Sequence, residues 1–276
     1  MRKILTIAGS DSSGGAGIQT DLKTFSACRT YGMSVITAIT AQNTMGVTCV
    51  ENVSPSMVSS QMSAVFSDIE VDAVKIGMLS ESSIIGSVYE GLTKYGAKNI
   101  VLDPVMISTS GYDLIDQMAK SAMIEKLFKI ADLVTPNIHE AIAIASILEP
   151  DEDYSIKNTD DMVYVGRKIL NHTNKAVLIK GGHLEDDACD LLLYGDNLIY
   201  YKNKRIDTKN THGTGCTLSS AIAAYLGLGY QLKEAVSLAK DFITKAIEHS
   251  LDIGRGAGPT NPMGDIYDKL DMIKGD

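Results

Sequence analysis

The chain has 276 residues, of which 45% are hydrophobic and 21% charged, a composition typical of a globular enzyme and not of a disordered protein. Its formal net charge is -9 and no concentrated basic face is visible, which argues against a nucleic-acid binder. No apolar run approaches the roughly 18 to 20 residues that span a bilayer, and the apolar start is too short for a signal peptide, so we expect no membrane partner.

The sequence shows no sign of division into several domains. It contains no Pro/Ser-rich linker, charge block or repeat, so we expect a single domain over residues 1–276. The cysteines lie far apart, without C-x-x-C spacing or paired histidines, which argues against a zinc site and a disulfide framework. Reduced cysteines fit a cytoplasmic protein best. The four are Cys28, Cys49, Cys189 and Cys216.

The first predicted unit is a buried strand over residues 3–8, a glycine-rich loop over 9–17 and a helix over about 16–28. In open α/β sheets, ligands collect at the carboxyl ends of the strands, where this loop lies. The loop has neither the G-x-G-x-x-G spacing of a dinucleotide site nor the spacing of a P-loop. A nucleotide site of those two kinds is therefore not indicated.

Asp21 lies within this first helix, three residues after Ile18 and four before Phe25, and so points near the side that faces the sheet. A carboxylate there, one turn past a glycine loop, could bind a ligand hydroxyl or amine. A surface aspartate in an early helical turn, favoured by the helix dipole, is an equally good interpretation.

Gln42 follows the second predicted strand, residues 33–41, which is rich in Val, Ile and Thr. A side-chain amide both donates and accepts hydrogen bonds, which suits the edge of a heteroaromatic ring. Considered alone, Gln42 is better interpreted as a loop residue. A short strand ending at Val53 follows, and then a helix over 55–68 with Pro55 at its start.

The middle of the sequence repeats one rhythm of strand, polar turn and helix. Strands that alternate with helices of this length indicate βαβ crossovers and a parallel sheet. Because each polar turn follows a strand, all of them can face one edge of the sheet. The predicted strands are 73–76, 99–102 and 131–134, the polar turns are 77–80, 103–106 and 135–140, and the helices are 81–95 and one that begins at Glu140.

Asn137 and Glu140 are three residues apart in the first turn of that helix. The spacing matches an N-cap residue and its capping-box partner, which is the better interpretation of the pair considered alone. A glutamate there could also hold a magnesium ion, usually through water, with phosphates completing the shell. Asp103, before Pro104, offers a second carboxylate.

Lys180 follows a predicted strand over 175–179 and precedes two glycines. A lysine in that position can reach a nucleotide phosphate as a point charge, and a solvated lysine is an equally good interpretation. The other predicted elements are a loop over 149–160, a helix over 160–170, a hairpin of strands 189–194 and 198–202, helices 215–226 and 232–250, and a tail over 254–264 with little regular structure.

Residues 210–220 change from polar to apolar and helical at Gly213 to Cys216. Glycines that open a helix expose the unpaired N–H groups of its first turn at the positive end of the helix dipole, which favours a bound anion such as phosphate. We expect the same helix end to lower the pKa of the Cys216 thiol. Considered alone, an ordinary turn with Cys216 as a small buried hydrophobe is the better interpretation.

Seven motifs occur in an order that resembles the hydroxymethylpyrimidine and hydroxymethylpyrimidine-phosphate kinases of thiamine biosynthesis, within the ribokinase-like superfamily. The resemblance runs nearly end to end, and the combination of motifs is highly specific. The motifs are residues 9–21 (GSDSSGGAGIQTD), 40–44 (TAQNT), 75–79 (KIGML), 103–105 (DPV), 135–141 (TPNIHEA), 180–183 (KGGH) and 210–216 (NTHGTGC).

The resemblance implies a ribokinase-like α/β fold with a central, mostly parallel sheet flanked by helices on both faces, and the use of ATP and magnesium. It leaves a need for a monovalent cation such as K⁺ open, and it implies a homodimer. It also implies the site: Gly9, Asp21, Gln42, Met78 and Val105 would line the pyrimidine pocket; Asn137 and Glu140, with Asp103, would serve magnesium and phosphate; Lys180 and Thr211 would approach the nucleotide phosphates; His212 would belong to a mobile cover near the substrate; Gly213, Gly215 and Cys216 would form the anion hole.

The predicted reaction transfers the ATP γ-phosphoryl group to the hydroxymethyl group of 4-amino-5-hydroxymethyl-2-methylpyrimidine, and then to the monophosphate. In ribokinases proper the glycine turn ends in an aspartate that takes the proton of the attacking hydroxyl, whereas this chain has Cys216. In phosphoryl transfer most of the acceleration comes from positioning and charge stabilisation, so the anion hole is the firmer prediction and Cys216 as a base the weaker one.

Three other functions compete with this reaction. A pyridoxal or pyridoxine kinase, or an enzyme with both specificities, would act on a similar ring. Gln42 favours the pyrimidine because its amide matches the donor–acceptor edge of that ring. A pyrimidine sensor without turnover is disfavoured by Asn137, Glu140, Lys180 and Cys216 occurring together. A sugar or nucleoside kinase is disfavoured by the missing aspartate.

Overall fold

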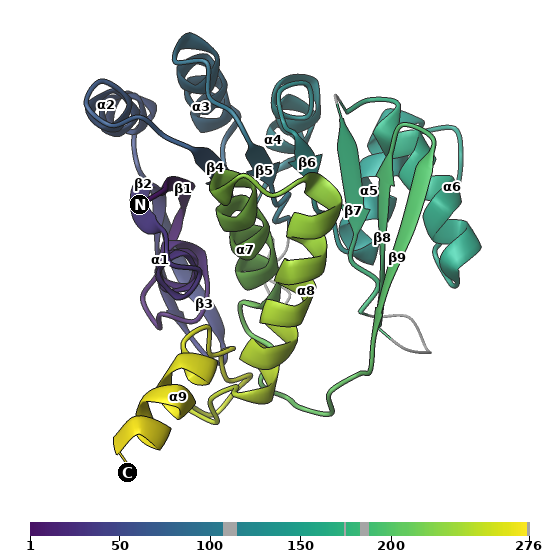
Figure 1. Cartoon of the computed structure of the whole chain (residues 1–276). Helices are drawn as coiled ribbons and strands as arrows, with labels where there is room; N and C mark the ends of the chain where they lie inside the picture. Colours follow the sequence, from purple (N-terminus) through teal and green to yellow (C-terminus); the bar gives the residue numbers. More distant parts are fainter. Residues whose placement is uncertain (107–114, 174, 183–187, 275–276) are drawn as a thin grey trace.

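A computed structural model describes residues 1–106, 115–173, 175–182 and 188–274 (Figure 1). Its centre is a nine-stranded sheet with the order β3-β2-β1-β4-β5-β6-β7-β8-β9. The strands from β2 to β7 in this order run parallel, and β3, β8 and β9 run antiparallel to their neighbours. The strands are β1 (Lys3–Asp11), β2 (Tyr31–Asn43), β3 (Gly46–Asn52), β4 (Ala73–Ile76), β5 (Ile100–Leu102), β6 (Leu133–Val134), β7 (Ala176–Ile179), β8 (Ala188–Tyr194) and β9 (Asn197–Asn203).

Helices cover both faces of this sheet, as the alternation of strands and helices predicts. Successive side chains of a strand point to opposite faces, so Leu5 and Ile7 of β1 pack into one apolar cluster and Ile4 into the other. The first cluster holds α2 (Pro55–Phe66), α3 (Ser82–Lys94), α4 (Gln117–Ala122), the π-helix η1 (Met123–Leu127), α5 (Ile138–Leu148) and α6 (Thr159–Leu170); the second holds α1 (Gly17–Ala27), α7 (Thr214–Leu228) and α8 (Leu232–Glu248). The last helix is α9 (Gly264–Lys274). The mostly parallel α/β fold is confirmed.

Capping residues explain where several of these helices begin. Ser54 accepts a hydrogen bond from the Met57 amide at the start of α2, and Pro55 occupies the first helical position. Both α5 and α6 begin with complete capping boxes, in which an N-cap asparagine and an acidic residue three positions later satisfy each other's backbone amides. The predicted starts of these helices are therefore close to the observed ones.

The structure differs from the predicted elements in two respects. First, β1 continues to Asp11, because Ser10 and Asp11 still pair with β2 beyond an irregularity in the register, so Gly9 belongs to the strand and not to the loop. Second, α4, η1 and α9 were not predicted. Residues 107–114 lie outside the described part of the chain, and so does His183 of the predicted motif 180–183.

The carboxyl ends of the parallel strands meet at one edge of the sheet, and residues 255–256 contact this edge. Helix α7 packs against α1, β1, β4 and β5, and therefore covers the strand with which the chain starts. Thr44, in the turn between β2 and β3, accepts hydrogen bonds from the amides of Arg255 (3.2 Å) and Gly256 (3.1 Å). Segments more than 200 residues apart in the sequence are thus in contact at this edge. None of the described helices is long and apolar enough to cross a membrane.

Candidate active site

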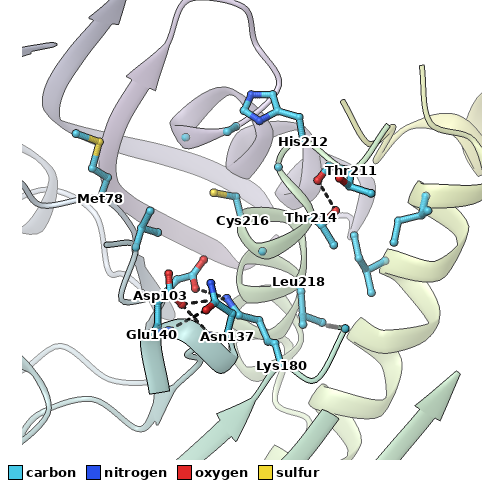
Figure 2. A pocket seen from close by; sticks show the side chains of 18 of the residues that line it. Met78, Asp103, Asn137, Glu140, Lys180, Thr211, His212, Thr214, Cys216 and Leu218 are labelled. Carbon is cyan, nitrogen blue, oxygen red and sulfur yellow. Dashed lines mark hydrogen bonds and ion pairs between the residues drawn. The ribbon is translucent and has the colours of Figure 1, made fainter. Parts of the chain in front are cut away.

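A cavity of about 690 Å³ lies at the carboxyl edge of the sheet (Figure 2). It is lined by the ends of β1 and β2, by the residues that follow β4, β5, β6 and β7, and by the start of α7. It contains all but one of the residues that the sequence suggested for a site: Gly9, Gln42, Met78, Asp103, Val105, Asn137, Glu140, Lys180, Thr211, His212, Gly213, Gly215 and Cys216. The exception is Asp21.

The start of α7 brings free backbone amides to this cavity. Gly213 is the N-cap residue and has a φ of 79°, in the left-handed region that favours glycine. A Cβ there would overlap the carbonyl oxygen of Gly15, so the two glycine-rich segments touch. Gly215 and Cys216 follow in the first turn, where amides lack an intrahelical acceptor, and both line the cavity. This geometry suits an anion at the positive end of the helix dipole.

The thiol of Cys216 corrects one expectation. Although the residue is partly exposed at the cavity surface, its sulfur is surrounded by protein. This burial raises the pKa of Cys216 to about 11, against the opposing effects of the Lys75 ammonium and of a hydrogen bond from the Gly17 backbone. The prediction of a lowered pKa is wrong, because desolvation outweighs the helix end. At neutral pH the side chain is a neutral thiol.

Below this turn, Lys180 is bound to the carboxylate of Asp103. The Lys180 Nζ lies 2.7 Å from Asp103 Oδ1 and 4.0 Å from Glu140 Oε2. Hydroxyl groups of Thr135 and Ser219 also donate to Asp103, at 3.2 Å each. Burial alone would raise the pKa of Asp103, but the ammonium groups of Lys180 and Lys75 and the Thr135 hydroxyl hold it below its usual value. Asp103 is therefore a carboxylate and Lys180 an ammonium in the folded protein.

Glu140 serves as a helix cap and faces the cavity at the same time. Its Oε2 accepts a hydrogen bond from the backbone N–H of Asn137 at 2.8 Å, and the Asn137 Oδ1 accepts one from the backbone N–H of Glu140 at 2.9 Å. The capping-box interpretation is thus confirmed, yet both residues line the cavity. Burial raises the pKa of Glu140 to about 7, with Lys180 acting in the opposite direction and Asp103 raising it further.

These oxygen atoms also bear on a magnesium site. Within the described ranges, no three His, Cys, Asp or Glu side chains are grouped as a metal cluster. Mg²⁺ is usually bound by only one or two carboxylates, with phosphates and waters completing the shell. Asp103 and Glu140 supply two carboxylates beside the ammonium of Lys180. The residues present therefore fit a magnesium ion that arrives with a nucleotide.

At the other end of the cavity, Gln42 lies near His212, and Met78 lies beside Gly9. The Gln42 Nε2 is 3.4 Å from the Nε2 of His212, and its Oε1 accepts the Thr40 hydroxyl at 3.0 Å. A Cβ on Gly9 would lie 3.3 Å from the Met78 sulfur, so a side chain at residue 9 would narrow this end. The result is a small pocket with an apolar wall and an amide, as a heteroaromatic ring requires.

Asp11 organises the glycine-rich loop, and sequence reasoning missed it. Its Oδ1 accepts the amide and hydroxyl of Ser13, both at 2.8 Å, and its Oδ2 accepts the amides of Gly15 (3.2 Å) and Ala16 (2.9 Å). The same Oδ2 lies 2.9 Å from His212 Nε2, which ties the loop to the segment before α7. An aspartate followed by two serines and two glycines is a signal for such a local turn.

Asp21 does not face the cavity. Its side chain is fully buried in an ion pair with Lys75, whose Nζ lies 2.9 Å from the Asp21 Oδ2. Asp21, predicted for the pyrimidine pocket, is not among the residues that line the cavity, because its carboxylate binds the Lys75 ammonium of β4. Lys75 lines the cavity instead. A lysine within the apolar strand Ala73–Ile76 was the available signal.

The cavity continues on the far side of α7, over an apolar surface that sequence reasoning also missed. Leu218 of α7 and Ile243 and Ile247 of α8 line it, and Met78 and Leu218 lie on opposite sides of Cys216 (Figure 2). A second buried ion pair closes this end, with the Lys240 Nζ 2.7 Å from Asp190 Oδ2. The cavity therefore has two compartments, which meet at the start of α7.

Comparisons with known proteins agree with this geometry. The family model described as phosphomethylpyrimidine kinase matches residues 11–261. A hydroxymethylpyrimidine/phosphomethylpyrimidine kinase of Rhizobium meliloti is 51% identical over 261 residues, 93% of this chain and 95% of that protein.

Two solved structures are also similar. A phosphomethylpyrimidine kinase of Clostridium difficile 630 has a TM-score of 0.78 at 51% identity, covering 90% of this chain and all of that one. An ADP complex of Bacillus subtilis pyridoxal kinase has a TM-score of 0.88 at 36% identity, covering 96% and 99%. The likeness thus extends to enzymes for two kinds of ring.

Proposed function

The chain belongs to the phosphomethylpyrimidine kinase family, and on that premise we propose that it phosphorylates 4-amino-5-hydroxymethyl-2-methylpyrimidine with ATP. The same site then phosphorylates the monophosphate to the diphosphate, as a step of thiamine biosynthesis. One observation carries the proposal: the start of α7, Lys180 and the pocket of Gln42 and Met78 share a single cavity. A nucleotide and a small ring can therefore meet in front of the Gly215 and Cys216 amides.

We place the nucleotide in the compartment on the α8 side. There Leu218, Ile243 and Ile247 offer an apolar surface for the base, and Thr211 and Lys180 lie towards the start of α7, where the phosphates would be. The ammonium of Lys180 already has Asp103 as a partner at 2.7 Å, so it is held in place before a phosphate arrives. A pre-positioned cation stabilises charge without reorganisation during the reaction.

Magnesium would be held by Asp103 and Glu140, with Asn137 beside them, and would neutralise phosphate charge when bound. The chain's own contribution is to fix these oxygen atoms through the capping box and the bond to Lys180. The ring would lie between Gly9, Met78 and Val105, with the Gln42 amide at its edge and His212 over it.

Cys216 acts in this proposal through position and not as a base. Its pKa of about 11 leaves almost no thiolate at neutral pH. The amides of the first turn of α7 then hold the developing charge, which is the usual main source of acceleration in phosphoryl transfer.

We also propose a cytoplasmic homodimer in which residues 1–276 form one kinase domain. Ile39 and Met45 support the homodimer, because they are 58% and 61% exposed beside β3, an edge strand of the sheet. Four unpaired cysteines support a reducing compartment. Light scattering after size-exclusion chromatography measures the oligomeric state directly.

Steady-state kinetics with the purified protein test the function. The pyrimidine alcohol, its monophosphate and pyridoxal are each supplied with Mg-ATP, in K⁺ and in Na⁺ buffers, and ADP release is measured. We expect kcat/KM to be highest for the two pyrimidines and Gln42→Ala to lower it by about 10-fold or more, because an amide matched to a ring edge is worth about 1–3 kcal/mol.

Pyridoxal is the competing substrate, because the pyridoxal kinase of Bacillus subtilis is so similar in structure. A higher kcat/KM for pyridoxal would replace the proposed substrate. Calorimetric binding of the pyrimidine without ADP release would instead indicate a sensor.

A further inference from the structure

The ion pair between Lys75 and Asp21 has no role in the function proposed so far. Both side chains are fully buried, and the Lys75 Nζ lies 3.0 Å and 2.9 Å from the two carboxylate oxygens. The hydroxyls of Thr6 and Ser220 each donate to Asp21 at 2.6 Å. Replacing a buried ion pair by apolar residues is often neutral or stabilising, so stability alone gives no reason for this pair.

The pair lies directly beneath the reacting end of the cavity. Lys75 lines the cavity although its side chain is fully buried, and Asp21 does not line it, so Lys75 is the member of the pair nearer the ligand space. Ser220 follows Cys216 by four residues and therefore lies one turn below it on the same side of α7. The bond from Ser220 to Asp21 ties the pair to that helix.

The ammonium is oriented and still has a donor to offer. A lysine has three N–H donors, and the two oxygens of Asp21 account for two of them. Among the described residues, no acceptor is found for the third. Gly77 leaves the space beside it open, because a Cβ there would lie 2.8 Å from the Lys75 Nζ.

The charges are arranged as a fixed dipole. Asp21 is the negative end, inside the protein, and Lys75 is the positive end, at the cavity. Lys75 is also near enough to Cys216 to oppose the effect of burial on the pKa of that thiol. A charge held in such a dry place acts more strongly than one in water.

We propose that Lys75 is a further catalytic group of this kinase, which stabilises negative charge on the acceptor oxygen beside Cys216, and that Asp21 is the positioning residue that aims it. This inference rests on the proposed function. Lys75 stays protonated throughout. The bond from the γ-phosphorus to the ADP oxygen breaks and a bond to the acceptor oxygen forms. With the alcohol as acceptor, the hydroxyl proton passes to a phosphoryl oxygen; with the monophosphate, the attacking oxygen is already ionised and no proton is transferred.

A cation on the acceptor side also explains how one pocket could serve two acceptors. The pyrimidine alcohol is neutral, whereas its monophosphate approaches the ATP γ-phosphate with negative charge of its own. Lys75 offsets that repulsion. Loss of the cation should therefore slow the second phosphorylation more than the first, which a purely structural role of the pair would not do.

The test uses the double variant Asp21→Asn/Lys75→Met, which removes both charges and keeps similar shapes, so no unpaired charge is left inside. We expect it to fold, judged by circular dichroism, with the KM for ATP within about threefold of the parent. We expect kcat for the alcohol to fall about 100-fold and kcat for the monophosphate about 1,000-fold, the range found when one stabilising donor is removed.

A second variant, Gly77→Ala, keeps both charges and displaces the ammonium, because the new Cβ would lie 2.8 Å from the Nζ. We expect a smaller fall in kcat, about 10-fold, again larger for the monophosphate. Lys168→Met is the control: it breaks an ion pair with Glu149 outside the cavity and should leave both rates unchanged.

A folded double variant with both rates within about threefold of the parent would overturn the inference, and so would equal losses for the two acceptors. If the double variant does not fold, Gly77→Ala decides by the same ratio of rates. A parent protein that phosphorylates neither acceptor would instead overturn the proposed function, so the two failures are distinguishable.

Discussion

Burial decides the charge state of the residues around the start of α7. The helix end and Lys75 both favour a Cys216 thiolate, but burial raises the pKa of the thiol to about 11. The carboxylate of Asp103 is also buried and stays ionised, because Lys180 lies 2.7 Å away. A close, directly bonded partner therefore offsets desolvation here, whereas a more distant charge does not.

The neutral thiol leads to a prediction for Cys216. Since a protonated thiol cannot accept the hydroxyl proton at neutral pH, Cys216→Ala should lower kcat by only about 10-fold, less than the 10²–10⁴-fold that a general base contributes. Lys180→Met should lower it by about 100-fold or more, because a charge that faces the phosphates is lost. Both are measured as ADP release at pH 7.5, with Lys168→Met as the control. A loss above about 1,000-fold in Cys216→Ala would restore the role of a base.

The site could be predicted from local sequence where a residue's role depends on its own turn. Lys180 and the glycines before Cys216 stand at the ends of strands or the start of a helix, and they do line the cavity. Asp21 was misjudged because its partner Lys75 is 54 residues away, and helical periodicity specifies a face of α1 but not what lies opposite. The local turn around Asp11 carried a sequence signal, but its bond to His212, 201 residues away, did not.

Two glycine-containing segments, Gly9–Gly17 and 210–216, form one unit at the scale of elements. Gly213 cannot carry a side chain without striking Gly15, and a Cβ on Gly15 would strike His212 in turn. A hydrogen bond of 2.9 Å between Asp11 Oδ2 and His212 Nε2 joins the two segments. The start of α7 is thus positioned by the loop after β1, and the anion site depends on both.

Gly213→Ala tests this dependence. With a φ of 79° and no room for a Cβ, the variant should lose about 1–3 kcal/mol of unfolding free energy and about 100-fold or more in kcat. Gly229→Ala, at the other end of α7, is a matched control, because its φ is 100° but a Cβ there has open space. It should be destabilised by about 1–2 kcal/mol with kcat unchanged. Urea unfolding and the ADP assay measure both, and similar kcat values in the two variants would contradict the prediction.

Strands and helices with clear periodicity or caps were predicted close to their observed bounds. The strand 73–76 coincides with β4, and the helix 160–170 begins one residue inside α6, whose capping box is local. The end of β1 was placed too early, because its last pairs depend on β2 and not on its own composition. Sequence reasoning also missed α4, which has only six residues, and α9, which follows the last strand–helix unit.

At the scale of the whole molecule, the cavity makes stability depend on pH. Glu140 is buried and its folded pKa is about 7, against the ordinary value of 4.5 that it has when unfolded. A raised acidic pKa means that the folded state binds more protons between these values. The contribution of Glu140 to the free energy of unfolding is therefore complete below pH 4.5 and is lost as the pH rises through 7.

We predict that Glu140→Gln removes this loss in the ligand-free protein. From pH 4.5 to pH 8, the unfolding free energy of the parent should fall by about 2–3 kcal/mol relative to that of the variant. Urea unfolding at several pH values, with both proteins compared at each one, cancels the contributions of other groups such as Asp103. Parallel curves for the two proteins would contradict the raised pKa.

The contacts between the first and last segments bear on how the protein is made. Helix α7 covers β1, and residues 255–260 hold the turn at Thr44 and the backbone of His212. A nascent polypeptide that has emerged only as far as β9 exposes the apolar face formed by Ile4, Ala73 and Val101. We expect such a chain to need a chaperone, and to become an enzyme only after residue 260 leaves the ribosome.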